Sequence, residues 1–166
     1  FIFFYFLLIQ VLKAEIVEKI NVEGNQRISS DTIKMFSGVS VNDNLFEDDL
    51  NRILKKLYNT NFFDLVSVKI INKVLIISVK ENPIIQSVKF EGIKKSTIID
   101  ALRENIKLKE KNSFIKNRVK KDEELITNIL KSNGYYFAEV KTKYKENSNN
   151  TIDLIFNINL GDKAFI

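Results

Sequence analysis

Two stretches of the chain alternate apolar and polar side chains in the same way and end at the same residue type. The first covers residues 15–23 and stops at Gly24, and the second covers residues 83–91 and stops at Gly92. Alternation with a period of two predicts a β-strand with one buried face. The predicted core-facing residues are Ile16, Ile20 and Val22, then Ile84, Val88 and Phe90, with Glu18 and Gln86 as the polar exceptions on that side.

Two helices are predicted after each of these strands. Ser30 and Ser96 are the expected N-caps of the first helices, because a serine hydroxyl can accept a bond from an unpaired N–H in the first turn. Gly38 is expected to end the first helix of the first copy. The second helix carries apolar residues on one face in both copies. These residues are Leu50, Ile53, Leu54, Leu57 and Tyr58, and, in a weaker stripe, Val119, Ile126, Ile129 and Leu130.

Each second helix runs into a strand through a similar joint, at residues 57–66 and again at residues 130–140. Asn61 and Gly134 stand where the helix ends, and both residue types tolerate the left-handed conformation that ends many helices. The next two residues of each joint are aromatic, and they are expected to begin a strand and to lie in the core. They are Phe62 and Phe63 in the first copy, and Tyr135 and Tyr136 in the second.

A hairpin closes each copy, with one turn near Asn72 and Lys73 and the other within residues 146–150. The order β-α-α-β-β therefore occurs twice. This order predicts an α+β fold of two tandem domains, each a three-stranded mixed sheet covered on one face by two helices.

The predicted domains cover residues 15–82 and 83–162, with a boundary at Glu81, Asn82 and Pro83. Proline cannot donate to a strand ladder, which suits a boundary between domains. The last four residues, 163–166, are similar to those that open the second domain. They are expected to begin a third unit.

The first fourteen residues differ from the rest, because eleven of the first twelve are apolar or aromatic. This segment is shorter than the roughly 20 residues of a membrane-spanning helix. It fits the apolar core of a signal peptide whose first residues are missing, with Ala14 before the cleavage site. A membrane anchor with missing residues is the alternative, and both interpretations predict export.

The composition argues against several kinds of chemistry. The chain has no cysteine and no histidine, so it lacks thiol nucleophiles, imidazole bases, disulfides and the usual zinc ligands. An acidic pair at residues 48–49 and an acidic triplet at residues 122–124 fit charges at helix starts better than a catalytic or calcium site. The net charge is +5, but the lysines are mixed with acids and arginine is scarce, which disfavours nucleic acid as a partner. No cofactor or metal is predicted, and an enzyme is the least favoured class.

Two motifs give the repeat a family resemblance. The segment at residues 20–28, Ile-Asn-Val-Glu-Gly-Asn-Gln-Arg-Ile, and the joint at residues 57–63 resemble POTRA domains, in particular those at the start of BamA-type outer-membrane protein assembly factors. Residues 79–83 also match the family's link between units. Asn61 departs from the usual glycine and Ile93 from the usual asparagine.

The resemblance implies a periplasmic arm of an outer-membrane protein. Such arms receive unfolded outer membrane proteins from periplasmic chaperones and hold accessory assembly lipoproteins, while a C-terminal barrel inserts the clients. The arm of another transporter, such as a translocation and assembly factor or a two-partner secretion pore, is the alternative within the family. A single-span division scaffold of the FtsQ type is the alternative outside it.

An open strand edge offers unpaired N–H and C=O groups, to which an extended client can add a strand by β-augmentation. In the family this edge is the second strand of each unit. The candidate client-binding residues are therefore Leu65, Val66, Ser67, Val68, Lys69 and Ile70 in the first unit, and Ala138, Glu139, Val140, Lys141, Thr142, Lys143 and Tyr144 in the second. The competing interpretation is that Lys69, Lys141 and Lys143 shield these edges against aggregation.

Overall fold

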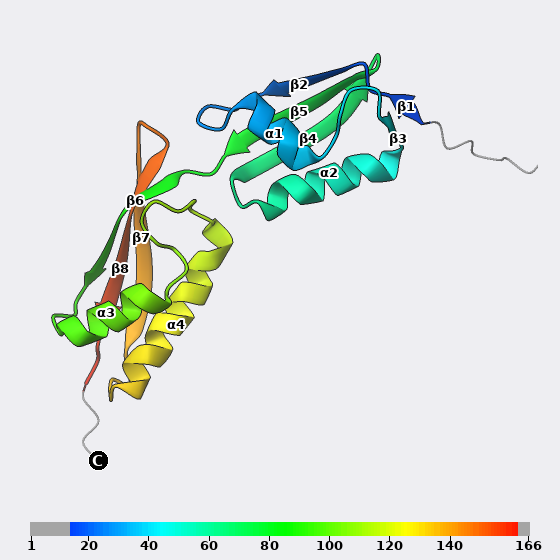
Figure 1. Cartoon of the computed structure of the whole chain (residues 1–166). Helices are drawn as coiled ribbons and strands as arrows, with labels where there is room; N and C mark the ends of the chain where they lie inside the picture. Colours follow the sequence, from blue (N-terminus) through cyan, green and yellow to red (C-terminus); the bar gives the residue numbers. More distant parts are fainter. Residues whose placement is uncertain (1–13, 163–166) are drawn as a thin grey trace, which may run out of the picture. The chain divides into compact units, whose positions relative to one another are not determined.

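The computed structural model describes residues 14–162, which form two compact units, and the chain passes from one unit to the other between Glu81 and Asn82 (Figure 1). The proposed leader at residues 1–14 falls outside the described residues except for Ala14. The proposed start of a third unit at residues 163–166 also falls outside them. Within residues 14–162, no helix is both long enough and apolar enough to cross a bilayer.

The first unit contains two helices and a three-stranded mixed sheet. Its central strand is the last one in sequence, so the strand order is β2-β5-β4, with β2 parallel and β4 antiparallel to β5. Both helices cover the same face of this sheet (Figure 1). The elements are β1 (Glu15–Ile16), β2 (Lys19–Glu23), α1 (Ser30–Ser37), β3 (Asn44–Leu45), α2 (Glu47–Asn59), β4 (Phe63–Ile71) and β5 (Val74–Glu81).

The second unit repeats this arrangement. Its sheet has the order β6-β8-β7, again with a parallel and an antiparallel pair and with both helices on one face (Figure 1). The elements are β6 (Ile84–Glu91), α3 (Ser96–Asn105), a 3-10 turn η1 (Lys116–Arg118), α4 (Val119–Ser132), β7 (Glu139–Asn147) and β8 (Thr151–Asn159). The two units confirm the predicted α+β fold.

Each unit has its own core between the sheet and the helices. In the first, Ile53 and Leu57 of α2 pack with Leu75 and Ile77 of β5. In the second, Ile126 and Leu130 of α4 are their counterparts, and they pack with Leu154 and Phe156 of β8. Phe156 is fully buried, and its ring stacks on Phe90 with the centroids 5.5 Å apart. The predicted apolar helix stripes therefore point at the central strands.

The first strand of each unit departs from the predicted alternation. Val17 and Ile85 are fully buried, whereas Ile16 is exposed and Ile84 is only partly buried. The chain changes phase at the polar residue of each strand. At Glu18 the strand breaks between β1 and β2, and at Gln86 the pairing of β6 with β8 shifts register. Glu18 and Gln86 are therefore exposed residues at irregularities, and the prediction that they face the core is wrong.

The predicted N-caps are wrong by one residue. Ser29 caps α1, and its hydroxyl accepts a hydrogen bond from the N–H of Thr32 at 3.2 Å, while Ser30 is the first helical residue. In α3 the cap is Lys95, whose side chain makes no capping bond, and Ser96 again begins the helix. Gly38 does end α1, in the left-handed conformation with φ 67°.

The two joints agree in their helix ends and differ in the segment after the helix. Asn61 and Gly134 adopt the predicted positive φ, 61° and 89°. Phe63 is buried and begins β4, but β7 begins only at Glu139, after an additional turn. This turn leaves Tyr136 half exposed, whereas Tyr135 packs against the core. In the second unit the prediction that the pair begins a strand is therefore wrong, and the prediction that it lies in the core holds for Tyr135 alone.

The connection between α3 and η1 is held in place by buried residues. Leu108 is buried, and so is the carboxylate of Asp122 in the first turn of α4. Asp122 accepts hydrogen bonds from the N–H groups of Lys107 and Leu108 at 2.8–3.1 Å. Asp122 therefore fixes the path of the connection, a role beyond that of a charge at a helix start.

Candidate functional site

The predicted client-binding residues lie on outer strands. Leu65 to Ile70 all belong to β4, and the seven residues of the second set belong to β7 except Ala138, which is buried just before it. Both strands are longer than predicted, because β4 covers Phe63–Ile71 and β7 covers Glu139–Asn147. Each is bonded to its central strand on one side and has no strand on the other within the described residues.

The opposite edge of the second sheet, β6, is partly covered by the connection between its helices. The N–H of Lys111 donates to the carbonyl of Ile85 at 2.8 Å, and the N–H of Ile85 donates to Asn112 at 2.9 Å. The Glu110 carboxylate also accepts the N–H of Val88 at 3.1 Å. Residues 110–112 thus occupy main-chain groups that a foreign strand would need.

The first unit closes its corresponding edge in a similar way. Strand β1 pairs antiparallel with β3, which belongs to the connection between α1 and α2. The N–H of Val17 donates to Asp43 at 2.9 Å, and the N–H of Asn42 donates to Val17 at 2.7 Å. The start of each unit's first strand is therefore occupied, which leaves β4 and β7 as the longer accessible edges.

The outer edge of β4 is capped near its beginning by a tyrosine. Tyr58, at the end of α2, accepts the N–H of Val66 on its hydroxyl at 3.1 Å. This bond shows that the N–H of Val66 points away from β5. Because N–H groups alternate sides along an antiparallel strand, those of Val68 and Ile70 point outward as well. The register also shifts between Phe63 and Leu65, so regular pairing begins beyond that point.

The outer edge of β7 is capped near its middle by a carboxylate. Glu123, in the first half of α4, accepts the N–H of Thr142 on its Oε1 at 2.7 Å. A short bond to a charged acceptor is stronger than one to a neutral hydroxyl. The Glu123 bond therefore divides the outer edge of β7 into two shorter parts.

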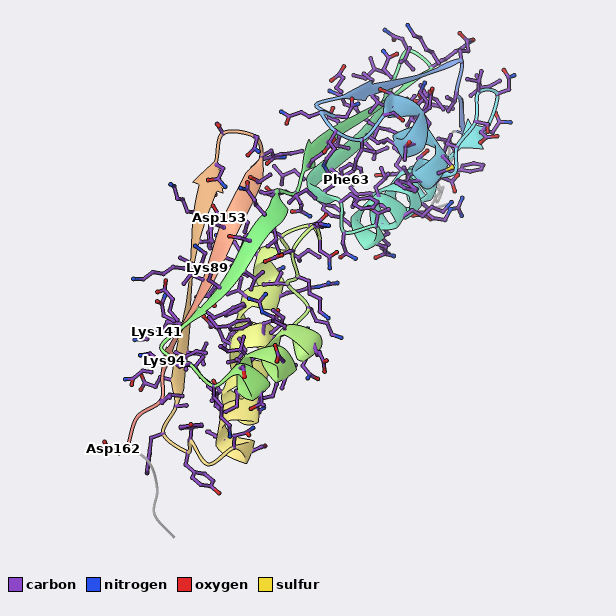
Figure 2. All side chains as sticks on the ribbon, turned by 60° about the vertical axis from the view of Figure 1, so that its left-hand side comes forward. Phe63, Lys89, Lys94, Lys141, Asp153 and Asp162 are labelled. Carbon is purple, nitrogen blue, oxygen red and sulfur yellow. The ribbon has the colours of Figure 1, made fainter. Side chains whose placement is uncertain are left out.

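The side chains on the helix-free faces of the two outer strands differ in charge. In β7 the exposed positions on that face include Lys141, Lys143 and Lys145, and Figure 2 labels Lys141 on this strand and Lys89 on β6. In β4 the corresponding positions include a single lysine, Lys69, between apolar ends. Leu65 and Ile71 form these ends and are 59% and 47% exposed.

One acidic residue sits among the lysines of the second sheet. Asp153 of β8 accepts hydrogen bonds from the Ser87 hydroxyl at 2.5 Å and the Asn147 amide at 3.1 Å. The bond from Ser87, then that from Asn147, holds the pKa of Asp153 below its ordinary value, with smaller help from Lys89 and Lys145. Asp153 therefore stays ionised and reduces the positive charge of this face.

The three predicted boundary residues belong to different units, Glu81 to the first and Asn82 and Pro83 to the second. Glu81 ends β5 in the first unit, and its side chain is 1% exposed. Its Oε1 accepts three main-chain N–H groups at 2.9 Å each, and Oε2 lies 3.5 Å from Nε of Arg27. Glu81 thus anchors the loop at residues 26–28, between β2 and α1. Asn82 and Pro83 precede β6, and the carbonyl of Pro83 accepts the N–H of Phe114 at 2.7 Å.

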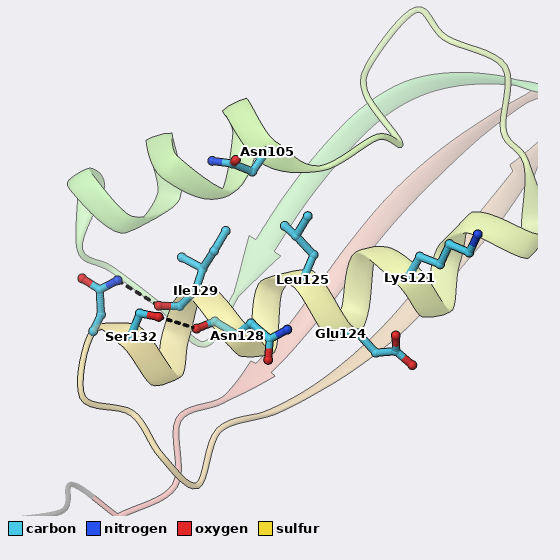
Figure 3. A pocket seen from close by; sticks show the side chains of 8 residues that line it. Asn105, Lys121, Glu124, Leu125, Asn128, Ile129 and Ser132 are labelled. Atoms are coloured by element: carbon cyan, nitrogen blue, oxygen red, sulfur yellow. Dashed lines mark hydrogen bonds between the residues drawn. The ribbon is translucent and has the colours of Figure 1, made fainter.

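A hollow of about 450 Å³ lies on the helical side of the second unit, between the end of α3 and the length of α4 (Figure 3). Figure 3 shows Leu125 and Ile129 pointing from α4 toward α3, with Lys121 and Glu124 toward one end. Its other lining residues carry hydroxyl or amide groups, and these are Asn105, Asn128, Ser132 and Asn133. It is an open depression and has no set of convergent charged groups.

The sequence did not reveal three side chains that accept hydrogen bonds from main-chain N–H groups, namely Tyr58, Asp122 and Glu123. Each was assigned to a simpler role, as part of an apolar stripe or as a charge at a helix start. Their bonding partners lie 8 to 19 positions away in the chain. The only hint in the sequence is that Glu123 replaces the apolar residue Leu50 when the two second helices are aligned.

A mixed three-stranded sheet with two helices on one face, made twice in sequence, matches a known class of repeated domain. The POTRA family, described as "surface antigen variable number repeat", matches residues 15–82 and again residues 83–161. The chain therefore belongs to the POTRA family and contains two tandem POTRA domains.

Two curated relatives are outer membrane protein assembly factors named BamA. The one from Neisseria meningitidis serogroup B is 34% identical over 90 residues, which is 54% of this chain. The one from Neorickettsia risticii is 31% identical over 81 residues, which is 49% of this chain. The aligned region covers 11% of each relative's length.

Solved structures with the same fold include POTRA regions of cyanobacterial Omp85 proteins. The N-terminal domain of Omp85 from Thermosynechococcus elongatus has a TM-score of 0.56 at 13% identity, covering 86% of this chain and 62% of that one. The POTRA1-2 fragment from Anabaena Omp85 has a TM-score of 0.53 at 12% identity, covering 91% and 98%. At this level of identity the likeness concerns the fold.

Proposed function

We propose that this chain is part of the periplasmic arm of a BamA-type outer-membrane protein assembly factor and acts by binding, without catalysis. Its clients are unfolded outer membrane proteins delivered by periplasmic chaperones, and accessory assembly lipoproteins are its other partners. The homology to BamA proteins supports this role. The observation that carries the proposed binding mode is the outer edge of β4, where main-chain groups beyond Val66 face away from the sheet.

The chemistry of such clients suits an open strand edge. A strand of an outer-membrane barrel alternates apolar and polar side chains over about ten residues. Main-chain bonding does not depend on side-chain identity, so one edge can receive many clients. The neighbouring side chains Leu65 and Ile71 offer exposed apolar surface to such a strand.

The test is a titration of the isotopically labelled chain with a peptide of about ten residues that alternates valine or leucine with serine or threonine. We expect hydrogen exchange at the amides of Val68 and Ile70 to slow, because these N–H groups gain a partner. The amides of Ser67 and Lys69 point toward β5 and are the internal controls, whose exchange should change little. Changes confined to the hollow between α3 and α4 would reject β-augmentation as the binding mode.

A proline variant gives a second check of the same site. Val68→Pro removes one outward N–H, and proline is tolerated on edge strands when that group faces solvent. We expect peptide affinity to fall about tenfold, which corresponds to the loss of one good hydrogen bond. Lys69→Ala is the control that keeps the main chain intact. Unchanged affinity in a folded Val68→Pro variant would count against pairing at β4.

A further inference from the structure

The two candidate edges are not equivalent, and the difference comes from one position on the second helix of each unit. The sheets can be aligned by their ladders. Val68 pairs with Ile77, whose partner is Val22, two residues before Gly24. Thr142 pairs with Phe156, whose partner is Phe90, two residues before Gly92. Val68 and Thr142 therefore occupy the same place on their outer strands.

The helices can be aligned by their buried residues. Ile53 and Leu57 of α2 correspond to Ile126 and Leu130 of α4, with the same spacing and the same burial. With this alignment Leu50 of α2 stands where Glu123 stands in α4. Both side chains are partly buried. One of them can accept a hydrogen bond and the other cannot.

This single difference changes what an approaching strand would meet. At Thr142 the outward N–H is already bonded to the Glu123 carboxylate at 2.7 Å. A client would have to displace a charge-assisted bond and bring its own carbonyl oxygen close to a negative carboxylate. At Val68 the equivalent helix residue is a leucine, and the Tyr58 hydroxyl accepts the preceding outward N–H, that of Val66, two residues earlier.

The side chains of the outer strands also disfavour strand addition at β7 and favour it at β4. A strand added to β7 would lie beside Lys141, Lys143 and Lys145, whose charges would lose part of their hydration. Lysines on an edge are a common means of preventing strand addition. A strand added to β4 would instead lie beside Leu65 and Ile71, with Lys69 between them.

We propose that the first unit receives extended apolar client strands on β4 from Val68 onward, and that Glu123 closes the matching edge of the second unit. This inference rests on the proposed function and assigns the client to one of its two candidate edges. The predicted residues Ala138 to Tyr144 then form a protected edge, and Leu65 to Ile70 contain the binding site.

The test exchanges the two helix residues. In the unaltered chain, the alternating peptide should slow amide exchange at Val68 and leave Tyr144 unchanged. Glu123→Leu should make the amide of Tyr144 protectable by the peptide. Leu50→Glu should weaken binding at Val68 about tenfold, because a carboxylate then competes for its N–H. Glu123→Gln, which keeps a neutral acceptor of the same size, is the matched control and should leave β7 closed or only weakly open.

The outcomes separate the two proposals. Equal protection of Val68 and Tyr144 in the unaltered chain would overturn the assignment while leaving strand addition intact. Protection at Val68 that is insensitive to Leu50→Glu in a folded variant would overturn the role of this helix position in controlling the edge. Absence of protection at both edges, in the unaltered chain and in all variants, would overturn strand addition, the binding mode of the proposed function. If Glu123→Leu does not fold, the unaltered chain still decides between the edges, and Leu50→Glu still tests the role of the helix residue.

Discussion

Replacing Gly92 with alanine is expected to destabilise the second unit by about 4 kcal/mol, one of the larger effects a single substitution has. Gly92 directly follows β6 and has φ 89°, and a Cβ atom at this position would overlap the carbonyl oxygen of Ile158. Ile158 lies in β8, so its carbonyl oxygen cannot move without disturbing the central strand.

Gly134 provides the matched control for this substitution. It has the same φ of 89°, but a Cβ atom there would meet nothing within 4 Å among the described residues. Gly134→Ala should therefore show only the strain of the left-handed conformation, about 1 kcal/mol. Equilibrium urea unfolding followed by circular dichroism measures both values. Equal losses of unfolding free energy at the two positions would mean that the close contact at Gly92 relaxes with little energetic cost.

Replacing Glu81 with alanine is expected to destabilise the first unit by about 3 kcal/mol, because three main-chain N–H groups lose a buried charged acceptor. The N–H groups belong to Gln26, Arg27 and Ile28, and all three bonds are 2.9 Å long. Their amide exchange should accelerate more than that of the β4–β5 ladder. Hydrogen exchange read by NMR measures this effect residue by residue.

Lys80→Ala is the neighbouring control for Glu81→Ala. Lys80 pairs with Asp64 at 3.0 Å, but the two side chains are 68% and 49% exposed. An exposed pair of this kind contributes less than about 1 kcal/mol. If Glu81→Ala proved as mild as Lys80→Ala, the loop at residues 26–28 would have to be held by other contacts.

The repeated fold was predictable because its signals are periodic and local. The stripe that includes Ile53 and Leu57 can point in only one direction on a helix, and it faces the central strand as expected. Asn61 and Gly134 marked helix ends through their own conformational preferences. Such features depend on a few neighbouring residues, which the sequence displays directly.

The irregularities in the first strands could not be predicted in the same way. A polar residue among apolar ones, such as Glu18 or Gln86, fits either a satisfied core position or a break in the strand. In the structure the strand is irregular at both residues, and this brings Val17 and Ile85 into the cores. The decision depends on pairing partners in distant segments, which periodicity does not reveal.

The two edges also looked alike in the sequence for a physical reason. Acidic residues near the start of a helix are stabilised there by the helix dipole, so Glu123 needed no further explanation in the sequence. Its bond to Thr142 depends on how α4 lies along β7. Only the packed structure shows that the carboxylate reaches a main-chain group 19 positions away.

The position of the central strands has a consequence for how the chain folds. In both units the strand that pairs with the other two is the last to be synthesised, β5 in one and β8 in the other. The parallel pair in each sheet also joins the two ends of its unit, a type of contact that forms slowly because a long loop must close first. A unit that emerges N-terminus first therefore cannot form its three-stranded sheet until its final strand is available, and the outer strands of that sheet remain exposed to wrong partners during that interval.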